Sequence, residues 1–204
     1  MITGLVLFDV SGHGVSSGLI TTLVRPILYR TFTADPSVAL KDIITTANRI
    51  IKAKGDVDNY LTCVMLRFAG TEVHYINAGH PDIIKKDITS VAPVIPSGMP
   101  VQGAFMGYEG MIEFFEESSR EHRFAMKRND VLVLFTDCLA ETKSSDGSEF
   151  GISGISRVLS DAPQTVTASE LLGCIVAAHT AHRGSAPLTD DLTILVIKVR
   201  EGAE

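Results

Sequence analysis

Hydrophobic positions recur along the chain at intervals that favour two kinds of element. Residues 5–8 form a run of apolar side chains, which is typical of a buried strand, so we expect a strand over residues 4–9. Apolar positions then recur at helical spacing and predict a helix over residues 14–33. These positions are Val15, Leu19, Leu23 and Ile27. Because Pro26 inside this helix removes a hydrogen bond, we expect a bend near Arg25.

The next elements follow the same two periods. A second amphipathic helix is expected over residues 36–54, with Asp35 as its N-cap and Pro36 at its first position. Residues 60–68 and 72–77 then read as two strands joined by a tight turn. The first half of the chain therefore predicts one strand, two helices and a β-hairpin.

The second half reads as strands, then helices, then a last strand. The expected strands cover residues 82–86, 111–116, 121–126, 131–135 and 192–199, with a Gly- and Pro-rich loop over 89–110 and helices at 153–160 and 168–183. A capping box of Thr167 and Glu170 begins the last helix. Hairpins dominate and strands do not alternate regularly with helices. The sequence therefore predicts an α+β fold of mainly antiparallel sheets, not a doubly wound parallel sheet.

The composition fits one globular domain over residues 1–204. Hydrophobic residues make up 45% of the chain and charged residues 21%, which excludes a disordered protein. The net charge of -6 argues against a nucleic-acid-binding surface. The three cysteines are odd in number and their spacing suits neither zinc nor a disulfide framework, so we expect a reducing, cytoplasmic setting. No apolar run reaches the roughly 18 residues of a membrane span.

Acidic residues stand next to three of the apolar strands. Asp9 ends the first strand, Asp137 follows a later one, and Asp190 and Asp191 precede the last. If these strands are neighbours, their carboxylates gather at one edge of a sheet, where a divalent cation would offset their repulsion. Asp is a hard ligand that suits Mg²⁺ or Mn²⁺, and two such ions can clamp a phosphoryl group. On spacing alone, the alternative is three unrelated surface acids at turns.

The turn after Asp9 adds an element that suits an anion. Gly12 and Gly14 space this turn, which leads into a helix whose first N–H groups favour a phosphate. His13 is a candidate acid that would protonate a leaving serine oxygen, because its unperturbed pKa is near neutral. The alternatives are that Asp9 is an ordinary turn acid and that His13 caps the turn.

Five segments together resemble the bacterial PPM-type serine/threonine phosphatases, which are 2C-like protein phosphatases. In chain order they are Asp9–Gly14, Asn77–Pro81, Leu134–Asp137 with Glu141, Phe150–Gly151 and Asp190–Thr193. The similarity covers nearly the whole chain and is to the branch of the sporulation stage II protein E and the RsbU-type regulators of sigma factors. It implies a β-sandwich of two antiparallel sheets flanked by helices. It also implies a manganese- or magnesium-dependent phosphatase that acts in signal transduction.

The resemblance also implies roles for individual residues. Asp9 would bridge two metal ions and the Val10 carbonyl would bind one of them, while Asp137 and Asp190 would bind the other. Metal-bound hydroxide would then attack a phosphoserine or phosphothreonine. Asp191 and Glu141 would support these ligands. The implied partner is a phosphorylated anti-sigma-factor antagonist, with a homodimer and a tethered N-terminal sensor domain as further expectations.

Two positions depart from the pattern of that family. Members usually carry a Gly-Asp motif on an upstream strand, and its acid completes the second metal site. Because only eight residues precede Asp9, we expect the first strand to be missing and the domain to be N-terminally truncated. Cys138 stands where Gly is common. Its thiol is read either as a small apolar filler or as a soft metal ligand.

Two other functions stay open at the level of the sequence. The absent upstream acid would fit a catalytically inactive phosphatase-like module that binds a phosphoprotein without turnover. The first two helices would fit a plain dimerisation module. Lys85 and Lys86 are expected at an ordinary exposed turn.

Overall fold

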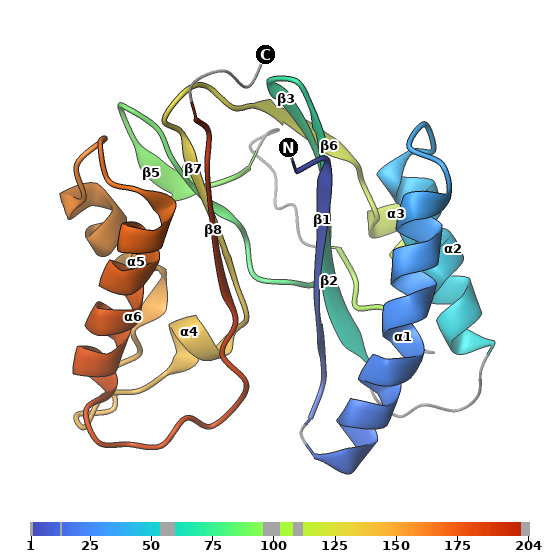
Figure 1. Ribbon diagram of the computed structural model, residues 1–204. Helices are drawn as coiled ribbons and strands as arrows, with labels where there is room; N and C mark the ends of the chain where they lie inside the picture. Colours follow the sequence, from blue (N-terminus) through green and yellow to red (C-terminus); the bar gives the residue numbers. More distant parts are fainter. Residues whose placement is uncertain (1, 13, 54–59, 96–102, 108–111, 201–204) are drawn as a thin grey trace. The chain divides into compact units, whose positions relative to one another are not determined.

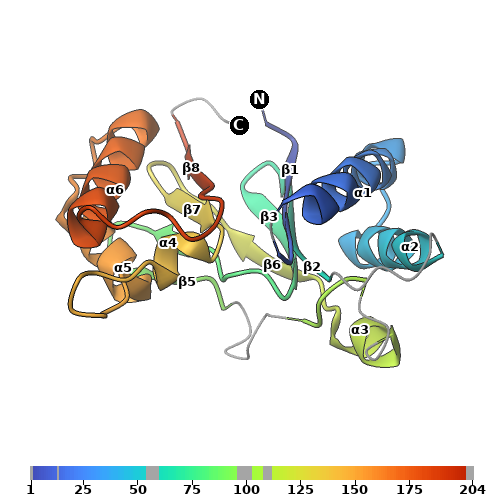
Figure 2. The same cartoon turned by 90° about the horizontal axis from the view of Figure 1, so that it is seen from below.

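The chain folds into two compact units, each with its own sheet and helices (Figures 1 and 2). The computed structural model describes residues 2–12, 14–53, 60–95, 103–107 and 112–200. The first unit comprises Met1–His80 and Ile95–Ala125, and the second comprises Pro81–Val94 and Met126–Glu204. Both sheets are antiparallel throughout, which confirms the predicted α+β class.

The first unit is a four-stranded sheet with helices. Its elements are β1 (Gly4–Val10), α1 (Val15–Ala34), α2 (Leu40–Lys52), β2 (Leu61–Ala69), β3 (Glu72–Ala78), α3 (Ile112–Ser118) and β6 (His122–Ala125). The strands lie in the order β1-β2-β3-β6. The predicted hairpin is confirmed, because β2 and β3 pair from Val64 opposite Asn77 to Ala69 opposite Glu72.

Strand alternation decides which face of this sheet the helices cover. Val6, Phe8 and Val10 of β1 belong to the hydrophobic core that α1 and α2 share with the sheet. Asp9 alternates with Phe8 and Val10, so it lies on the opposite face of the sheet. The pattern of β1 therefore keeps its carboxylate out of the helix-facing core.

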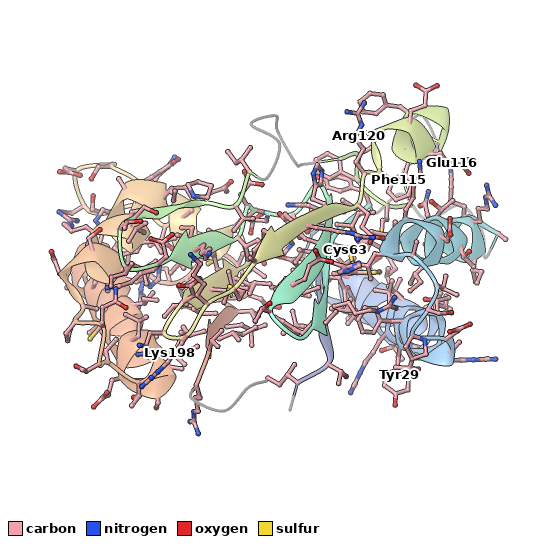
Figure 3. All side chains as sticks on the ribbon, turned by 90° about the horizontal axis from the view of Figure 1, so that it is seen from above. Tyr29, Cys63, Phe115, Glu116, Arg120 and Lys198 are labelled. Carbon is pink, nitrogen blue, oxygen red and sulfur yellow. The ribbon has the colours of Figure 1, made fainter. Side chains whose placement is uncertain are left out.

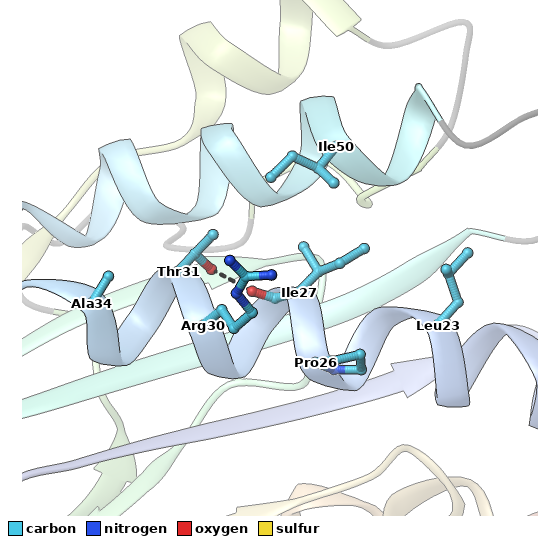
Figure 4. A pocket seen from close by; sticks show the side chains of 7 residues that line it. All are labelled: Leu23, Pro26, Ile27, Arg30, Thr31, Ala34 and Ile50. Atoms are coloured by element: carbon cyan, nitrogen blue, oxygen red, sulfur yellow. Dashed lines mark hydrogen bonds between the residues drawn. The ribbon is translucent and has the colours of Figure 1, made fainter.

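Helix α1 buries a different stripe from the apolar repeat that stands out in the sequence. Its buried residues are Ile20, Val24 and Leu28, whereas Leu19 of the repeat is 68% exposed. A groove of about 520 Å³ runs along α1 and is lined by Leu23, Pro26, Ile27, Arg30, Thr31, Ala34 and Ile50 (Figure 4). The helix continues through Pro26 to Ala34. The bend expected near Arg25 stays a prediction.

Residues 112–118 form helix α3, so the strand predicted over residues 111–116 is wrong for its described part. The Ser119 N–H donates to the Phe115 carbonyl at 2.9 Å, a helical bond. Phe115 is buried in the core of the first unit, and Glu116 accepts from Arg49 of α2 at 2.6 Å (Figure 3). A buried aromatic side chain thus anchors a helix in the segment that was expected to be a strand.

The second unit has the same plan. Its elements are β4 (Ile84–Lys86), β5 (Val91–Pro93), β7 (Val131–Phe135), α4 (Cys138–Glu141), α5 (Gly151–Asp161), α6 (Ala168–Arg183) and β8 (Ile194–Lys198). The strands lie in the order β5-β4-β7-β8, and α5 and α6 flank the sheet (Figure 2). Strand β5 lies inside the segment predicted as loop, and α4 was not predicted. The capping box of α6 is confirmed, since Thr167 and Glu170 bond reciprocally.

The three cysteines are free thiols in the structure: Cys63 and Cys138 are buried, and Cys174 is exposed. Among the helices that the structure describes, none combines the length and apolar character that crossing a bilayer requires.

Helix α6 carries a buried histidine. His179 of α6 is almost fully buried, its ring packs edge-on against Phe150, and its Nε2 atom has no hydrogen-bond partner among the described residues. Burial, reinforced by the charges of Arg183 and His182, lowers the pKa of His179 below its ordinary value of 6.5. The folded protein therefore resists a proton that the unfolded chain accepts.

This difference predicts that acid weakens the fold. As the pH falls through about 6.5, the unfolded chain binds a proton at His179 and stability is lost, by at most about 1.4 kcal/mol per pH unit. His179→Phe keeps a ring against Phe150 and is expected to flatten this decline in urea unfolding measured between about pH 7.5 and 5.5. The pKa of His122 is also lowered, by burial and by Arg120, so the variant keeps the part of the pH dependence of stability that comes from His122. An identical pH slope in both proteins would contradict the assignment.

Candidate active site

Asp9 lies near the end of β1, directly opposite Thr62 of β2. The Thr62 hydroxyl forms a 2.8 Å hydrogen bond with Nδ1 of His80, which is buried. Paired residues of an antiparallel sheet project from the same face, so Asp9, Thr62 and the His80 ring belong to one face at one end of the sheet. Thr62 is a neighbour of the candidate acid that the sequence did not single out, since a lone Thr in a strand carries no signal.

The turn after Asp9 is tied to the start of β2. The Ser11 N–H donates to the Tyr60 carbonyl at 2.9 Å, and the Tyr60 N–H donates to Ser11 Oγ at 3.1 Å. Gly12 and Gly14 have φ angles of 80° and 92°, a region that favours glycine, so this backbone requires both glycines. Helix α1 follows at Val15, as the anion-binding hypothesis requires. His13 lies outside the described residues, and its role as an acid stays a prediction.

The Asn77–Pro81 segment is a rigid turn rather than a set of reactive groups. The buried Asn77 side chain donates to the His80 carbonyl at 2.8 Å, and its Oδ1 accepts from the His80 N–H at 2.8 Å. This pair of bonds fixes the turn that presents His80 to Thr62. Asp82 follows in the second unit, where burial raises the pKa of its carboxyl group.

In the second unit, Asp137 and the Asp190–Asp191 pair lie at the same end of β7 and β8. Thr136 joins the two segments, because its N–H donates to the Thr193 carbonyl at 3.1 Å and its hydroxyl donates to the Asp191 carbonyl at 3.0 Å. The same hydroxyl accepts from the Thr193 N–H at 3.0 Å. Thr136 therefore holds the two acidic segments together, a role that its place before Asp137 could have suggested.

Cys138 completes this connection between the two segments. Its buried thiol donates to the Asp190 carbonyl at 3.3 Å. The side chain thus contributes a specific contact to the acidic loop, beyond the apolar filling expected of it. The Asp191 N–H donates to Oδ1 of Asp190 at 2.8 Å, which orients that carboxylate.

The expectation that all the acidic strand ends lie in one sheet is only partly correct. Strands β7 and β8 are neighbours, with Asp137 following β7 and Asp190 preceding β8. Strand β1 with Asp9 belongs to the other sheet. The sequence could not distinguish these cases, because apolar strands of both sheets have the same pattern.

The acids of the second unit suit a hard cation. Asp137, Asp190 and Asp191 are exposed, and none of them takes part in an ion pair with another described residue. Glu141, also exposed, lies on α4 one turn after Asp137 and its N–H donates to the Asp137 carbonyl at 2.9 Å. Exposed carboxylates without ion-pair partners offer the oxygen ligands that Mg²⁺ and Mn²⁺ prefer. Across the described part of the chain, no three His, Cys, Asp or Glu side chains form a ready metal cluster.

The comparison with known families decides the assignment. The profile of the family described as Stage II sporulation protein E (SpoIIE) matches residues 2–200. The chain belongs to the SpoIIE family. This family is one of PP2C-type phosphatases, which confirms the resemblance drawn from the five segments.

Named relatives of this SpoIIE-family chain are phosphatases. It is 27% identical over 146 residues to phosphoserine phosphatase RsbP of Bacillus subtilis, covering 70% of the chain and 34% of RsbP. The chain therefore spans about a third of the length of this curated relative.

Solved structures confirm the fold of the SpoIIE-family chain. The SiaA-PP2C domain of Pseudomonas aeruginosa has a TM-score of 0.79 at 18% identity, covering 96% of this chain and 74% of that one. The catalytic domain of the serine threonine protein phosphatase PstP, in complex with 2 manganese ions, has a TM-score of 0.61 at 14% identity, covering 98% of this chain and 88% of that one. The predicted architecture of two antiparallel sheets with flanking helices is thus confirmed.

Proposed function

We propose that the chain is a metal-dependent protein phosphatase domain that hydrolyses phosphoserine or phosphothreonine on a regulatory protein. The observation that carries the proposal is the pair of exposed acidic segments that Thr136 and Cys138 hold together at the end of β7 and β8. A metal-dependent phosphatase needs carboxylates to bind its metal ions. In the described part of the second unit, these carboxylates form no ion pair with a basic side chain.

The ligand set follows the sequence motifs. Asp9, the Val10 carbonyl, Asp137 and Asp190 are the groups proposed to hold Mn²⁺ or Mg²⁺. Two bound ions would supply charge neutralisation for the phosphoryl oxygens and an activated water. Within the first unit, pairing with β2 fixes Asp9 and Val10. Within the second unit, the Asp191 N–H holds the Asp190 carboxylate. The oxygen atoms of these residues are hard ligands.

The chain's own residues prepare these ligands. Thr136 fixes the distance between the two acidic segments, and the Asp191 N–H orients the Asp190 carboxylate. Thr62 and His80 lie on the face of Asp9 and brace the strand that presents it. Such supporting bonds keep ligand side chains in one arrangement and limit reorganisation during reaction.

The proposed substrate is a phosphorylated regulatory protein of the anti-sigma-factor antagonist type. RsbP carries the name phosphoserine phosphatase, and a structure containing the RsbU and RsbW domains of Rv1364c from Mycobacterium tuberculosis shares this fold. Attachment to a sensor domain, homodimerisation and a cytoplasmic setting remain parts of this proposal.

Manganese titration beside a turnover assay tests the proposed function. Calorimetry is expected to detect Mn²⁺ binding, and a phosphoserine peptide is expected to release phosphate only when Mn²⁺ or Mg²⁺ is present. Chelation with EDTA should abolish release and renewed Mn²⁺ should restore it. Phosphopeptide binding without turnover at saturating manganese would instead support an inactive binding module.

A further inference from the structure

A short segment after the first hairpin is fastened to the end of β2. Met106 and Leu61 exchange two backbone hydrogen bonds, of 2.8 and 2.9 Å, and the Gly103 N–H donates to the Asn77 carbonyl at 3.0 Å. The Gly107 N–H donates to the buried Asn48 side chain of α2 at 2.8 Å. Met106 is buried by this arrangement, and the neighbouring Phe105 is left partly exposed. The fold therefore holds Phe105 in a fixed place.

The Phe105 ring packs directly against Gly79. A Cβ atom at Gly79 would lie 2.3 Å from a ring carbon of Phe105, closer than any side chain allows, and the φ angle of Gly79 is 70°. The ring stacks on Tyr60, with centroids 4.7 Å apart and planes tilted by 31°. Tyr60 and Phe105 are 38% and 37% exposed, so they form one aromatic pair that faces solvent.

This aromatic pair lies beside the candidate catalytic turn. The Tyr60 carbonyl accepts from the N–H of Ser11, two residues after Asp9, and the Tyr60 N–H donates to Ser11 Oγ. Tyr60 directly precedes β2 and lies two residues before Thr62, the residue opposite Asp9. Two residues along a strand span about 7 Å, which is also the reach of two residues of an extended peptide.

We propose that Tyr60 and Phe105 determine substrate specificity by binding the polypeptide that flanks the phosphorylated residue. The inference rests on the proposed function, because it takes Asp9 as the place where the phosphoryl group is held. A phosphoserine side chain held there would bring an apolar side chain one or two residues away onto the aromatic pair. Exposed, preorganised aromatic rings offer apolar area at a low cost in conformational entropy, which suits this role.

Two phosphoserine peptides test the proposal, one flanked on both sides by leucine and one flanked by serine. The wild-type protein with Mn²⁺ is expected to favour the leucine-flanked peptide by about tenfold in kcat/KM, a difference of about 1.4 kcal/mol. Tyr60→Ala and Phe105→Ala should each remove most of this preference through a higher KM for the leucine-flanked peptide. Tyr60→Phe keeps the ring and should retain the wild-type preference.

Phe114→Ala is the matched control, because Phe114 is an exposed aromatic residue of α3 in the same unit. It is expected to leave the peptide preference unchanged. If the wild-type protein hydrolyses both peptides but Tyr60→Ala and Phe105→Ala keep its preference, the aromatic pair has no such role and the proposed function stands. If the wild-type protein hydrolyses neither peptide, the proposed function itself fails. A dimer that Tyr60→Ala disrupts in sedimentation would also overturn the proposal, since a second copy would then occupy the pair.

Discussion

Asp137→Asn is expected to lower kcat/KM for manganese-dependent hydrolysis of a phosphoserine peptide by at least about 100-fold, because supporting residues around metal ligands already cost 10- to 100-fold when removed. Asparagine keeps the size of the side chain and one oxygen but loses the negative charge that a divalent cation requires. Asp137 is exposed, so the replacement leaves no buried group unpaired and should preserve the fold. Asp9→Asn is expected to have an effect of similar size. Steady-state phosphate release and Mn²⁺ calorimetry measure the two consequences separately.

A matched acid in the same unit controls for charge alone. Asp161 ends α5 and is exposed, and Asp161→Asn should leave both turnover and Mn²⁺ affinity at wild-type values. The Asp137 variant should bind Mn²⁺ more weakly while unfolding at the wild-type urea concentration. Wild-type turnover in both Asp9→Asn and Asp137→Asn would remove the proposed mechanism.

The sequence predicts best those elements whose apolar pattern has only one reading. The run in residues 131–135 is apolar at every position and forms β7, whose five residues are all buried. The Thr167–Glu170 capping box begins α6 where expected, because two local hydrogen bonds fix that boundary regardless of tertiary context. Asp137 follows β7 and Asp190 precedes β8, and these two strands are neighbours.

Other features depend on contacts between distant residues and left no local signal. Residues 112–118 are helical because Phe115 enters the core and Glu116 meets Arg49, 67 positions earlier in the chain. The contact of the Phe105 ring with Gly79 joins residues 26 positions apart, and neither residue predicts this contact from its own sequence surroundings. Asp9 also belongs to a different sheet from the other acids, which strand patterns alone do not reveal.

Lys86 is the strongest case, because the expected exposed turn is instead a buried anchor. Lys86 of β4 is 5% exposed, and its Nζ donates to the Leu159 carbonyl at 2.5 Å and to the Ala162 carbonyl at the end of α5. Burial, with a smaller effect of Lys198, lowers the pKa of the Lys86 ammonium group. Carbonyl groups at a helix end have no partner within the helix, so a buried cation is a favourable substitute.

Lys198 of β8 makes the same kind of contact from the same row of the sheet. Lys86 and Lys198 are each paired with Val131 of β7, on either side of it. The Lys198 Nζ donates to the carbonyls of Gln164 and Val166 at 2.5 and 2.6 Å, just before α6 begins (Figure 3). The two lysines therefore fasten the connection between α5 and α6 to the sheet.

Lys86→Met is expected to reduce the free energy of unfolding by roughly 2–3 kcal/mol, because it leaves the carbonyls of the buried Leu159 and the half-buried Ala162 without their charged donor. Methionine keeps the apolar stem, so the loss reports the hydrogen bonds and not a cavity. In thermal unfolding the change corresponds to a fall in Tm of roughly 5–10 °C for a chain of this size. Lys127→Met, at an exposed lysine, is the control and should change stability by less than about 0.5 kcal/mol.

The double variant Lys86→Met with Lys198→Met shows whether the two lysines act on one connection. If one replacement already releases residues 159–166 from the sheet, the second replacement costs less stability. The sum of the losses in unfolding free energy of the two single variants should then exceed the loss of the double variant by about 0.5 kcal/mol or more. Urea unfolding of the four proteins gives this coupling directly. Strict additivity would mean that each lysine stabilises its own carbonyls independently. If Lys86→Met has the same unfolding free energy as the wild-type protein, the cost of burying this cation equals the stability that its hydrogen bonds contribute.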